Sequence, residues 1–290
     1  MRVLLLTAVA VLLVGCGKAA TSTQKVVTRT TYRVATTAPP LDVGVVGNLN
    51  VNVPGAKVQH GTLATLTAPL VLVQAGTSAA ARLASVAAAN PGTHYALVGG
   101  SAANLKLRNV VGLVIRDEPA AQLAGAVAGL VAEGEGVAAP RVGLIGPSNT
   151  SISFSFGLGV HAVTPHALVL HAWTGNAPAA CKEAALTLLI RGAVAITAQS
   201  GRCADAAVSG AHEQNAVAIR ISDFELLSVP ATEIVRDAVG GVFHGGEDLV
   251  FGPSSGAIGI GPLDPRISQA NVLRARTLAG RLASGQPLAG

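Results

Sequence analysis

The chain has 290 residues, 12% of them charged, and a formal net charge of +5. Its length suffices for one large domain or two lobes. Much of the basic excess lies in residues 18–33, and no cluster of Lys and Arg interleaved with aromatic residues follows, which excludes nucleic acid as a partner. A basic N-terminal segment suits an anionic membrane surface better.

Residues 1–15 have the pattern of a secretory signal, with Arg2 before an apolar core, 3–14, that is too short to anchor in a bilayer. The core ends in "LVGC", which resembles the lipobox of bacterial lipoproteins. The resemblance implies cleavage before Cys16 and lipidation of its thiol, leaving 290 − 15 = 275 residues. The alternative is an ordinary signal peptide with an incidental cysteine. Residues 16–40 are Thr-rich and aperiodic, and predict a disordered tether. We therefore expect a lipid-anchored protein on the extracytoplasmic side of the cell membrane.

From residue 41 onward, short apolar runs alternate with Ala-rich segments of helical spacing. Continuous Val, Ile and Leu runs predict strands buried on both faces, and alternation with helices predicts that they are parallel. The expected strands are 41–47, 69–76, 93–100, 110–115, 140–146, 166–173, 193–201, 216–222 and a short one in 256–261. The expected helices are 80–90, 119–134, 178–192, 203–215, 231–246 and 269–285.

Small polar residues follow most of the expected strands. In open α/β sheets, ligands bind beyond the carboxyl ends of the strands, where helix N-termini offer free N–H groups. The pattern therefore favours binding of a polar small molecule, although the same residues also serve as helix caps.

The segment "NVVGLVIRDEPAAQLAGAVAGLVA" (109–132) resembles the signature of the basic membrane protein family, the nucleoside-type substrate-binding lipoproteins of ABC importers. Further segments resemble that family in the same order: "RVGLIG", "AWTGN", "AALTLLIRGAVAITAQSG", "AVAIRISDF" and "VFHGGEDLVFGPSSGAIGIGPL". The resemblance covers roughly residues 41–285. It implies a two-lobed α/β periplasmic-binding-protein type I fold, each lobe a parallel sheet flanked by helices. Lobe 1 would comprise 41–116 and about 224–252, and lobe 2 would comprise 117–223 and about 253–290.

The chain departs from the family near its first strand. Residues 43–76 carry little helical signal, so the first helix of the family, and the loop that supplies ligand contacts, look deleted or reduced to Asn48 and Asn50. Aromatic residues make up only 3% of the chain, whereas relatives are expected to stack a base between aromatic rings. The resemblance therefore bears more on the fold than on the ligand.

Six residues are candidates for ligand binding. Asp117 is expected to be the N-cap of the helix that contains Pro119, and capping alone would account for both Asp117 and Glu118. Arg116 would pair with Asp117, Glu118 or Asp223, or meet a ligand. The complete set is Asn48, Arg116, Asp117, Trp173, Asp223 and Phe224.

The resemblance gives Asp223 a specific role, because an Asp at this strand end is expected to accept hydrogen bonds from ribose hydroxyls. The alternative is a hinge or capping carboxylate. Trp173, the only Trp, would stack on a ligand or lie in the core or between lobes, and Phe154 and Phe156 carry the same core-or-stacking alternative.

Two cysteines remain beside Cys16, and an even pair in an oxidising compartment predicts a disulfide between Cys181 and Cys203. In a β-α-β unit, a residue at the helix start and one just past the next strand lie at the same sheet edge. The alternative is two unpaired buried thiols.

Nothing in the sequence indicates a metal, a cofactor or catalysis. His161, His166 and His171 are five residues apart, which fits no common ligand spacing, and no nucleophile or phosphate-binding motif occurs. The expected function is substrate binding for an ABC importer permease, with a polar small molecule such as a nucleoside in the inter-lobe cleft. The alternative is a degenerate lipoprotein of this fold that acts through protein contacts without a ligand.

Overall fold

The computed structural model describes residues 39–175, 177–199 and 201–288. The expected signal peptide, the lipidation of Cys16 and nearly all of the expected tether lie outside these residues. No described helix combines the length and the hydropathy that a membrane-spanning helix needs.

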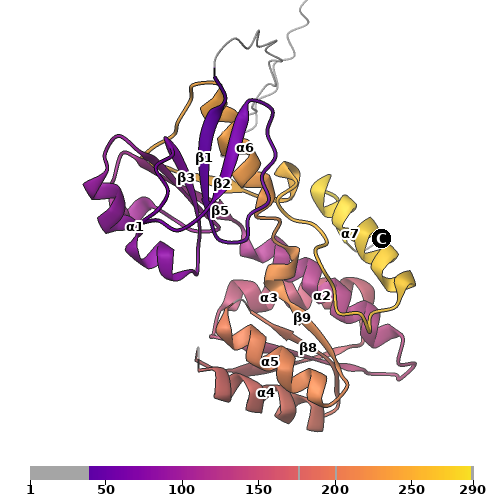
Figure 1. Ribbon diagram of the computed structural model, residues 1–290. Coiled ribbons are helices and arrows are strands. Elements are labelled where there is room, and N and C mark those ends of the chain that lie inside the picture. The colour runs from indigo at the N-terminus through magenta and orange to yellow at the C-terminus, as the bar shows by residue number, and fades with distance from the viewer. Residues whose placement is uncertain (1–38, 176, 200, 289–290) are drawn as a thin grey trace, which may run out of the picture. The chain divides into compact units, whose positions relative to one another are not determined.

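The chain forms two parallel sheets flanked by helices, which confirms the predicted α/β class (Figure 1). The six-stranded sheet has the order β10-β5-β4-β3-β1-β2, and the four-stranded sheet has the order β7-β6-β8-β9. Each sheet with its helices is called a lobe below, lobe 1 for the six-stranded sheet and lobe 2 for the four-stranded one. The strands are β1 Leu41–Val46, β2 Ala56–His60, β3 Leu70–Gln74, β4 His94–Val98, β5 Val110–Ile115, β6 Arg141–Gly146, β7 Leu168–Trp173, β8 Ala193–Ala198, β9 Val217–Arg220 and β10 Asp248–Phe251.

Seven α-helices and three short 3-10 turns lie in the described residues. The α-helices are α1 Ser78–Ala89, α2 Asp117–Glu133, α3 Thr150–Val163, α4 Pro178–Ile190, α5 Arg202–Glu213, α6 Ser228–Val239 and α7 Gln269–Ala283. The 3-10 turns are η1 Ala103–Leu105, η2 Ile221–Phe224 and η3 Pro253–Ser255.

Strand β3 shows why the apolar runs form buried parallel strands. Leu70 and Leu72 join the core that also holds residues of α6, whereas Val71 and Val73 join the core under α1. All four side chains are at most 1% exposed. Alternate residues of a strand point to opposite faces, so a strand covered on both sides is apolar throughout.

No helix forms between β1 and β3, as the sequence predicts. Strand β2, which was not predicted, instead pairs in parallel with β1, from Leu41 opposite Ala56 onward. The connection "GNLNVNVPG" alternates polar and apolar residues, and its Leu49, Val51 and Val53 are 3%, 7% and 6% exposed. These three side chains join the same core as α6, so an extended segment contributes to the packing on this face of lobe 1.

Helix α3 is an element that the sequence analysis missed. Its Ser and Gly content gives it low helix propensity. Its N-cap Asn149 accepts hydrogen bonds from the N–H groups of Ser151 and Ile152. A Cβ on Gly125 of α2 would lie 2.1 Å from the carbonyl oxygen of Phe156, and one on Gly159 would lie 1.9 Å from that of Gln122. Tertiary packing between glycine-bearing backbones therefore overrides propensity here.

Three crossovers join the lobes, and the second and third pair with each other. In the second crossover Leu226 N–H donates to the carbonyl of Ala257 at 2.8 Å, and Phe224 O accepts from Gly259 N–H at 3.0 Å. Gly261 N–H donates to the carbonyl of Asp223 at 2.9 Å. The expected strand at 256–261 is thus reduced to a single bridge, that of Ile258 with Glu225.

The third crossover is also anchored to lobe 2. The buried Asp264 carboxylate accepts hydrogen bonds from His212 Nε2 and from Ala218 N–H, both at 2.9 Å. Burial alone would raise the pKa of Asp264, but N–H groups of Arg266, Ala218 and His212 outweigh burial and lower this pKa. Helix α7 then packs beside α2, where Asn271 Nδ2 donates to the carbonyl of Leu130 at 3.1 Å (Figure 1).

Candidate functional site

The carboxyl ends of both sheets face the crossovers. Strand β5 ends at Ile115 and α2 begins at Asp117, so one residue separates the carboxyl edge of lobe 1 from the N-terminus of a lobe 2 helix. Helix α2 leads into the start of β6, which places its N-terminus at the carboxyl edge of the lobe 2 sheet. Polar residues at both carboxyl edges and at the crossovers form the candidate site, in the position where open α/β sheets bind ligands.

Arg116 and Asp117 lie at the first crossover, but not as predicted. Arg116 is the N-cap of α2 and Asp117 is its first helical residue, with no side-chain capping bond. The expectation that Asp117 caps the helix is therefore wrong. Asp117 and Glu118 both lie in the first turn, where negative charge offsets the helix dipole. Partial burial, and then the charge of Glu118, raise the pKa of Asp117.

Arg116 makes none of the ion pairs expected for it among the described residues. Its backbone N–H donates to the carbonyl of Phe251 at 3.0 Å, which ties the first crossover to the end of β10. Its side chain is exposed and passes Gly252, where a Cβ would lie 4.0 Å from the arginine Cδ.

Asp223 lies in η2 at the second crossover and is half-buried. Burial raises the pKa of Asp223, while the charge and the backbone N–H of Arg220 oppose that shift and the charge of Asp205 adds to it. Arg220 itself pairs with Asp205, Nε to Oδ1 at 3.2 Å. Asp223 thus belongs to a small charged cluster at the end of β9.

Phe224, predicted as a ligand contact, is 0% exposed and belongs to the main core. The strand end carries Ile221 and Phe224 inward together, so this ring does not face a surface that ligand can reach. This placement corrects the prediction. Phe156 is likewise 0% exposed, whereas Phe154 is 69% exposed on α3.

Trp173 ends β7, the edge strand of lobe 2, and is 49% exposed, so it is not a core residue. Its ring stacks on His171 with centroids 4.9 Å apart. Asn48 lies beyond β1 and is exposed, and its backbone N–H donates to Gln74 Oε1 at 2.8 Å. The structure therefore places Asn48, Trp173 and Asp223 at carboxyl strand ends, but no hydrogen bond, ion pair or ring contact among the described residues joins any two of them.

Glu225 was missed by the sequence analysis. It lies two residues after Asp223 and bridges to Ile258 of the third crossover. Burial, and then the charge of Asp117, raise the pKa of Glu225 to about 7. Glu225 thus lies in the second crossover, pairs through its backbone with the third, and is close enough to the first for the charge of Asp117 to act on its carboxyl group. The sequence signal that could have identified Glu225 is its position two residues after Asp223, at the end of an expected strand.

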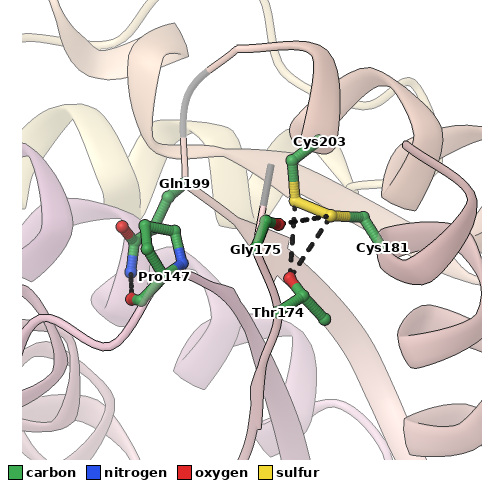
Figure 2. The surroundings of a disulfide bond; sticks show 6 residues. All are labelled: Pro147, Thr174, Gly175, Cys181, Gln199 and Cys203. Carbon is green, nitrogen blue, oxygen red and sulfur yellow. Dashed lines mark hydrogen bonds between the residues drawn. A yellow bond between two sulfur atoms is a disulfide. The ribbon is translucent and has the colours of Figure 1, made fainter. Parts of the chain in front are cut away.

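Gln74 and Gln199 were also missed. Gln74 is the last residue of β3 and Gln199 directly follows β8, and each precedes a small residue and a glycine, in "LVLVQAG" and "AITAQSG". Gln199 Nε2 donates to the carbonyl of Pro147 at 3.2 Å (Figure 2). The repeat of Gln, small residue and Gly in both lobes is a signal that sequence comparison of the two halves would have found.

The predicted disulfide between Cys181 and Cys203 is present, with the two Cα atoms 5.4 Å apart. It joins the first turns of α4 and α5 at the carboxyl edge of lobe 2. Thr174 Oγ1, just beyond β7, lies 3.3 Å from Cys181 Sγ and 3.7 Å from Cys203 Sγ (Figure 2). The bond therefore fixes the N-terminal turns of α4 and α5 against each other.

No group of three or more His, Cys, Asp or Glu side chains in the described residues is arranged to hold a metal ion. The three histidines considered in the sequence do not alter this, since His171 instead stacks on Trp173.

No protein-family model matches the chain, and no curated protein matches it in sequence. Solved structures do match. An ABC transporter system solute-binding protein from Conexibacter woesei DSM 14684 is similar at a TM-score of 0.58 and 20% identity, over 86% of this chain and 100% of that one. One from Aeropyrum pernix K1 has a TM-score of 0.53 and 17% identity, over 85% and 92% of the two chains.

The same fold occurs in a transcriptional activator of the comK gene from Bacillus halodurans, with a TM-score of 0.58, 15% identity and coverage of 85% and 99%. At these identities the likeness shows the fold alone. The predicted periplasmic-binding-protein type I fold is confirmed, and function has to be argued from the site.

Proposed function

We propose that this protein is an extracytoplasmic substrate-binding lipoprotein that delivers a polar small molecule to an ABC importer. The observation that carries the proposal is that the three crossovers begin at the carboxyl ends of β5, β9 and β10, with a set of polar side chains around them. That arrangement suits capture of a ligand between lobes. The names of the similar solute-binding proteins agree with it.

The proposed mechanism is closure of the two lobes around the ligand. Residues 41–116 with about 224–252 would move against 117–223 with about 253–290. A ligand that contacts both carboxyl edges binds the closed state more tightly than the open state, and this difference drives closure. The mutual hydrogen bonds of the second and third crossovers would keep these two segments together as a hinge.

We propose a nucleoside or similar sugar-bearing heterocycle as the ligand, on the basis of the family resemblance and the position of Asp223. Two carboxylate oxygens suit the vicinal diol of a ribose. Phe224 is excluded as a stacking partner by its burial, which leaves Trp173 as the exposed aromatic ring at a carboxyl strand end. This role needs no catalytic group and no cofactor, and the protein is proposed not to be an enzyme.

Calorimetric titration tests the ligand class. The mature chain is titrated with adenosine, guanosine, inosine, cytidine and uridine, with their free bases and with ribose. At least one nucleoside is expected to bind, and Asp223→Ala is expected to weaken that binding by about 1.5–3 kcal/mol, the range for a hydrogen bond to a charged group. Asp237→Ala is the matched control, because this carboxylate lies near the C-terminus of α6, away from the carboxyl edge. Absence of heat with every nucleoside would remove this function.

The lipid anchor is a separate proposal. Because Cys16 occupies the lipobox position, Cys16→Ser should move the protein out of the membrane fraction or leave it uncleaved. Unchanged partitioning, with no lipid mass on the mature N-terminus, would contradict the anchor.

One observation favours the second candidate, a lipoprotein of this fold that acts through protein contacts without a ligand. The helix that the family has after its first strand is absent between β1 and β3, as is expected if the ligand-contacting loop that precedes it in the family is reduced. Thermal unfolding separates the candidates, because a ligand at 100 times its dissociation constant adds about 2.7 kcal/mol of stability. No stabilisation by any nucleoside would favour the protein-contact role.

A further inference from the structure

The two lobes carry the same pair of residues at the ends of adjacent strands. In lobe 1, Gln74 lies over Gly47, where a Cβ would come within 2.6 Å of Gln74 Oε1. In lobe 2, Gln199 lies over Gly146, where a Cβ would come within 2.6 Å of Gln199 Cδ. Gly47 has φ of +113°, which also favours glycine. In each lobe a glycine at the end of one strand leaves room for a glutamine at the end of the next.

The Gln74 side chain accepts a hydrogen bond from the backbone, whereas the Gln199 side chain donates one to it. Gln74 Oε1 accepts from Asn48 N–H at 2.8 Å, so its Nε2 carries the free hydrogens. Gln199 Nε2 donates to the carbonyl of Pro147 at 3.2 Å, so its Oε1 carries the free lone pairs. The backbone partners fix both amide orientations. Gln74 Nε2 and Gln199 Oε1 have no partner among the described residues.

We propose that Gln74 and Gln199 determine ligand specificity, with lobe 1 donating a hydrogen bond to the ligand and lobe 2 accepting one from it. This inference rests on the proposed function. Both side chains are half-buried and lie at the carboxyl edges that the crossovers join. Closure would remove water from both amides, and a buried amide without a partner is costly. The ligand must therefore present an acceptor toward lobe 1 and a donor toward lobe 2.

The charges at the crossovers indicate that this ligand is uncharged or cationic. Around the first two crossovers the carboxylates are Asp117, Glu118, Asp223 and Glu225, and the guanidinium groups are Arg116 and Arg220. The third crossover adds Asp264 and Arg266, which pair with each other at 3.2 Å. Arg220 is already paired with Asp205 at 3.2 Å. A phosphate on the ligand would meet an excess of like charge, which disfavours binding. The assigned class is a polar molecule without negative charge that has an acceptor and a donor on opposite edges.

Two substitutions separate ligand recognition from stability. Gln74→Glu keeps the oxygen that accepts from Asn48 and removes the free donor. It should therefore unfold at the wild-type temperature but weaken nucleoside binding at least about tenfold. Gln199→Glu removes the donor to Pro147 and keeps an oxygen toward the ligand. It should unfold at lower temperature but bind within about threefold of wild type.

The measurements are calorimetric titration with adenosine, guanosine, inosine, cytidine, uridine and their 5′-monophosphates, together with thermal unfolding of each variant. Wild-type binding of a nucleoside in preference to its monophosphate, with the stated asymmetry between variants, is the expected result. Equal affinity of wild type and Gln74→Glu, or equal losses in both variants, would overturn the inference and leave the proposed function in place. Absence of nucleoside binding by the wild type would overturn both.

Discussion

Lobe 1 and lobe 2 carry the same arrangement at the ends of their strands but cover their sheets differently. Both place a glutamine over a glycine on adjacent strands. In lobe 1 the extended segment "NLNVNV" adds its apolar side chains to the core on one face, whereas in lobe 2 α4 and α5 cover one face and a disulfide joins their first turns. The carboxyl edge is thus kept in both lobes while the covering layer varies, which is expected if the edge is where the ligand binds.

The largest loss of stability is expected when a buried side chain of the extended segment in lobe 1 is truncated. Leu49→Ala should destabilise the protein by about 2–5 kcal/mol, because the leucine is 3% exposed in the main core. Its neighbour Asn50 is exposed, so Asn50→Ala should change stability by less than about 0.5 kcal/mol. Denaturant unfolding measures both. Equal effects of the two substitutions would mean that the segment does not pack in alternation.

The second prediction concerns the loss of stability when the disulfide of lobe 2 is removed. The double variant Cys181→Ala, Cys203→Ala should lose about 3 kcal/mol, since the bond closes a loop with a sequence separation of 22. Chemical unfolding with and without reductant measures it, and reductant should destabilise wild type but not the variant. Alkylation and mass measurement of the exported, unreduced protein should find Cys181 and Cys203 unreactive. Two free thiols would contradict the assignment.

The third prediction concerns Glu225, at the junction between the lobes. Glu225 has a pKa raised from 4.5 to about 7, so the folded state holds its proton over a range where the unfolded state has lost it. Its contribution is fully favourable below about pH 4.5 and is lost as pH rises to about 7. Glu225→Gln should therefore stabilise the protein at pH 8, by up to about 2–3 kcal/mol, and change little at pH 4.

Thermal unfolding of wild type and Glu225→Gln across pH 4–8 checks this prediction. Glu118→Gln is the control, because Glu118 is exposed in the adjacent first turn. A pH-independent difference between wild type and Glu225→Gln would show that Glu225 ionises normally.

Much of the fold could be predicted from the sequence, because long Val, Ile and Leu runs that alternate with Ala-rich helices specify buried parallel strands. The disulfide could be predicted because, in a β-α-β unit, the start of the helix and the residue just past the next strand lie at the same sheet edge. Helix α3 could not, since its stability comes from contact of Gly159 with α2 rather than from its own propensity. Strand β2 could not, because "AKVQH" at a sheet edge lacks an apolar run.

The site was harder to predict than the fold. The sequence places Asp223 and Trp173 at strand ends, but only the packing shows that Phe224 points into the core. The pKa of Glu225 depends on burial and on Asp117, which lies 108 positions earlier in the chain (225 − 117). The roles of Gln74 and Gln199 depend on a glycine in a neighbouring strand. Contacts between residues so far apart in the chain become visible only when the pairing of the strands is known.

Amide hydrogen exchange with and without a mixture of adenosine, guanosine, inosine, cytidine and uridine tests whether a ligand is held between the carboxyl edges of the two lobes. If a ligand is held between the carboxyl edges, exchange should slow at residues 47–48 and 74–77 of lobe 1 and also at 148–149 and 198–199 of lobe 2. The amino-end loops at 91–93 and 191–192 should exchange as before. Unchanged exchange at every strand end, or protection confined to one lobe, would contradict binding of a ligand between the two carboxyl edges.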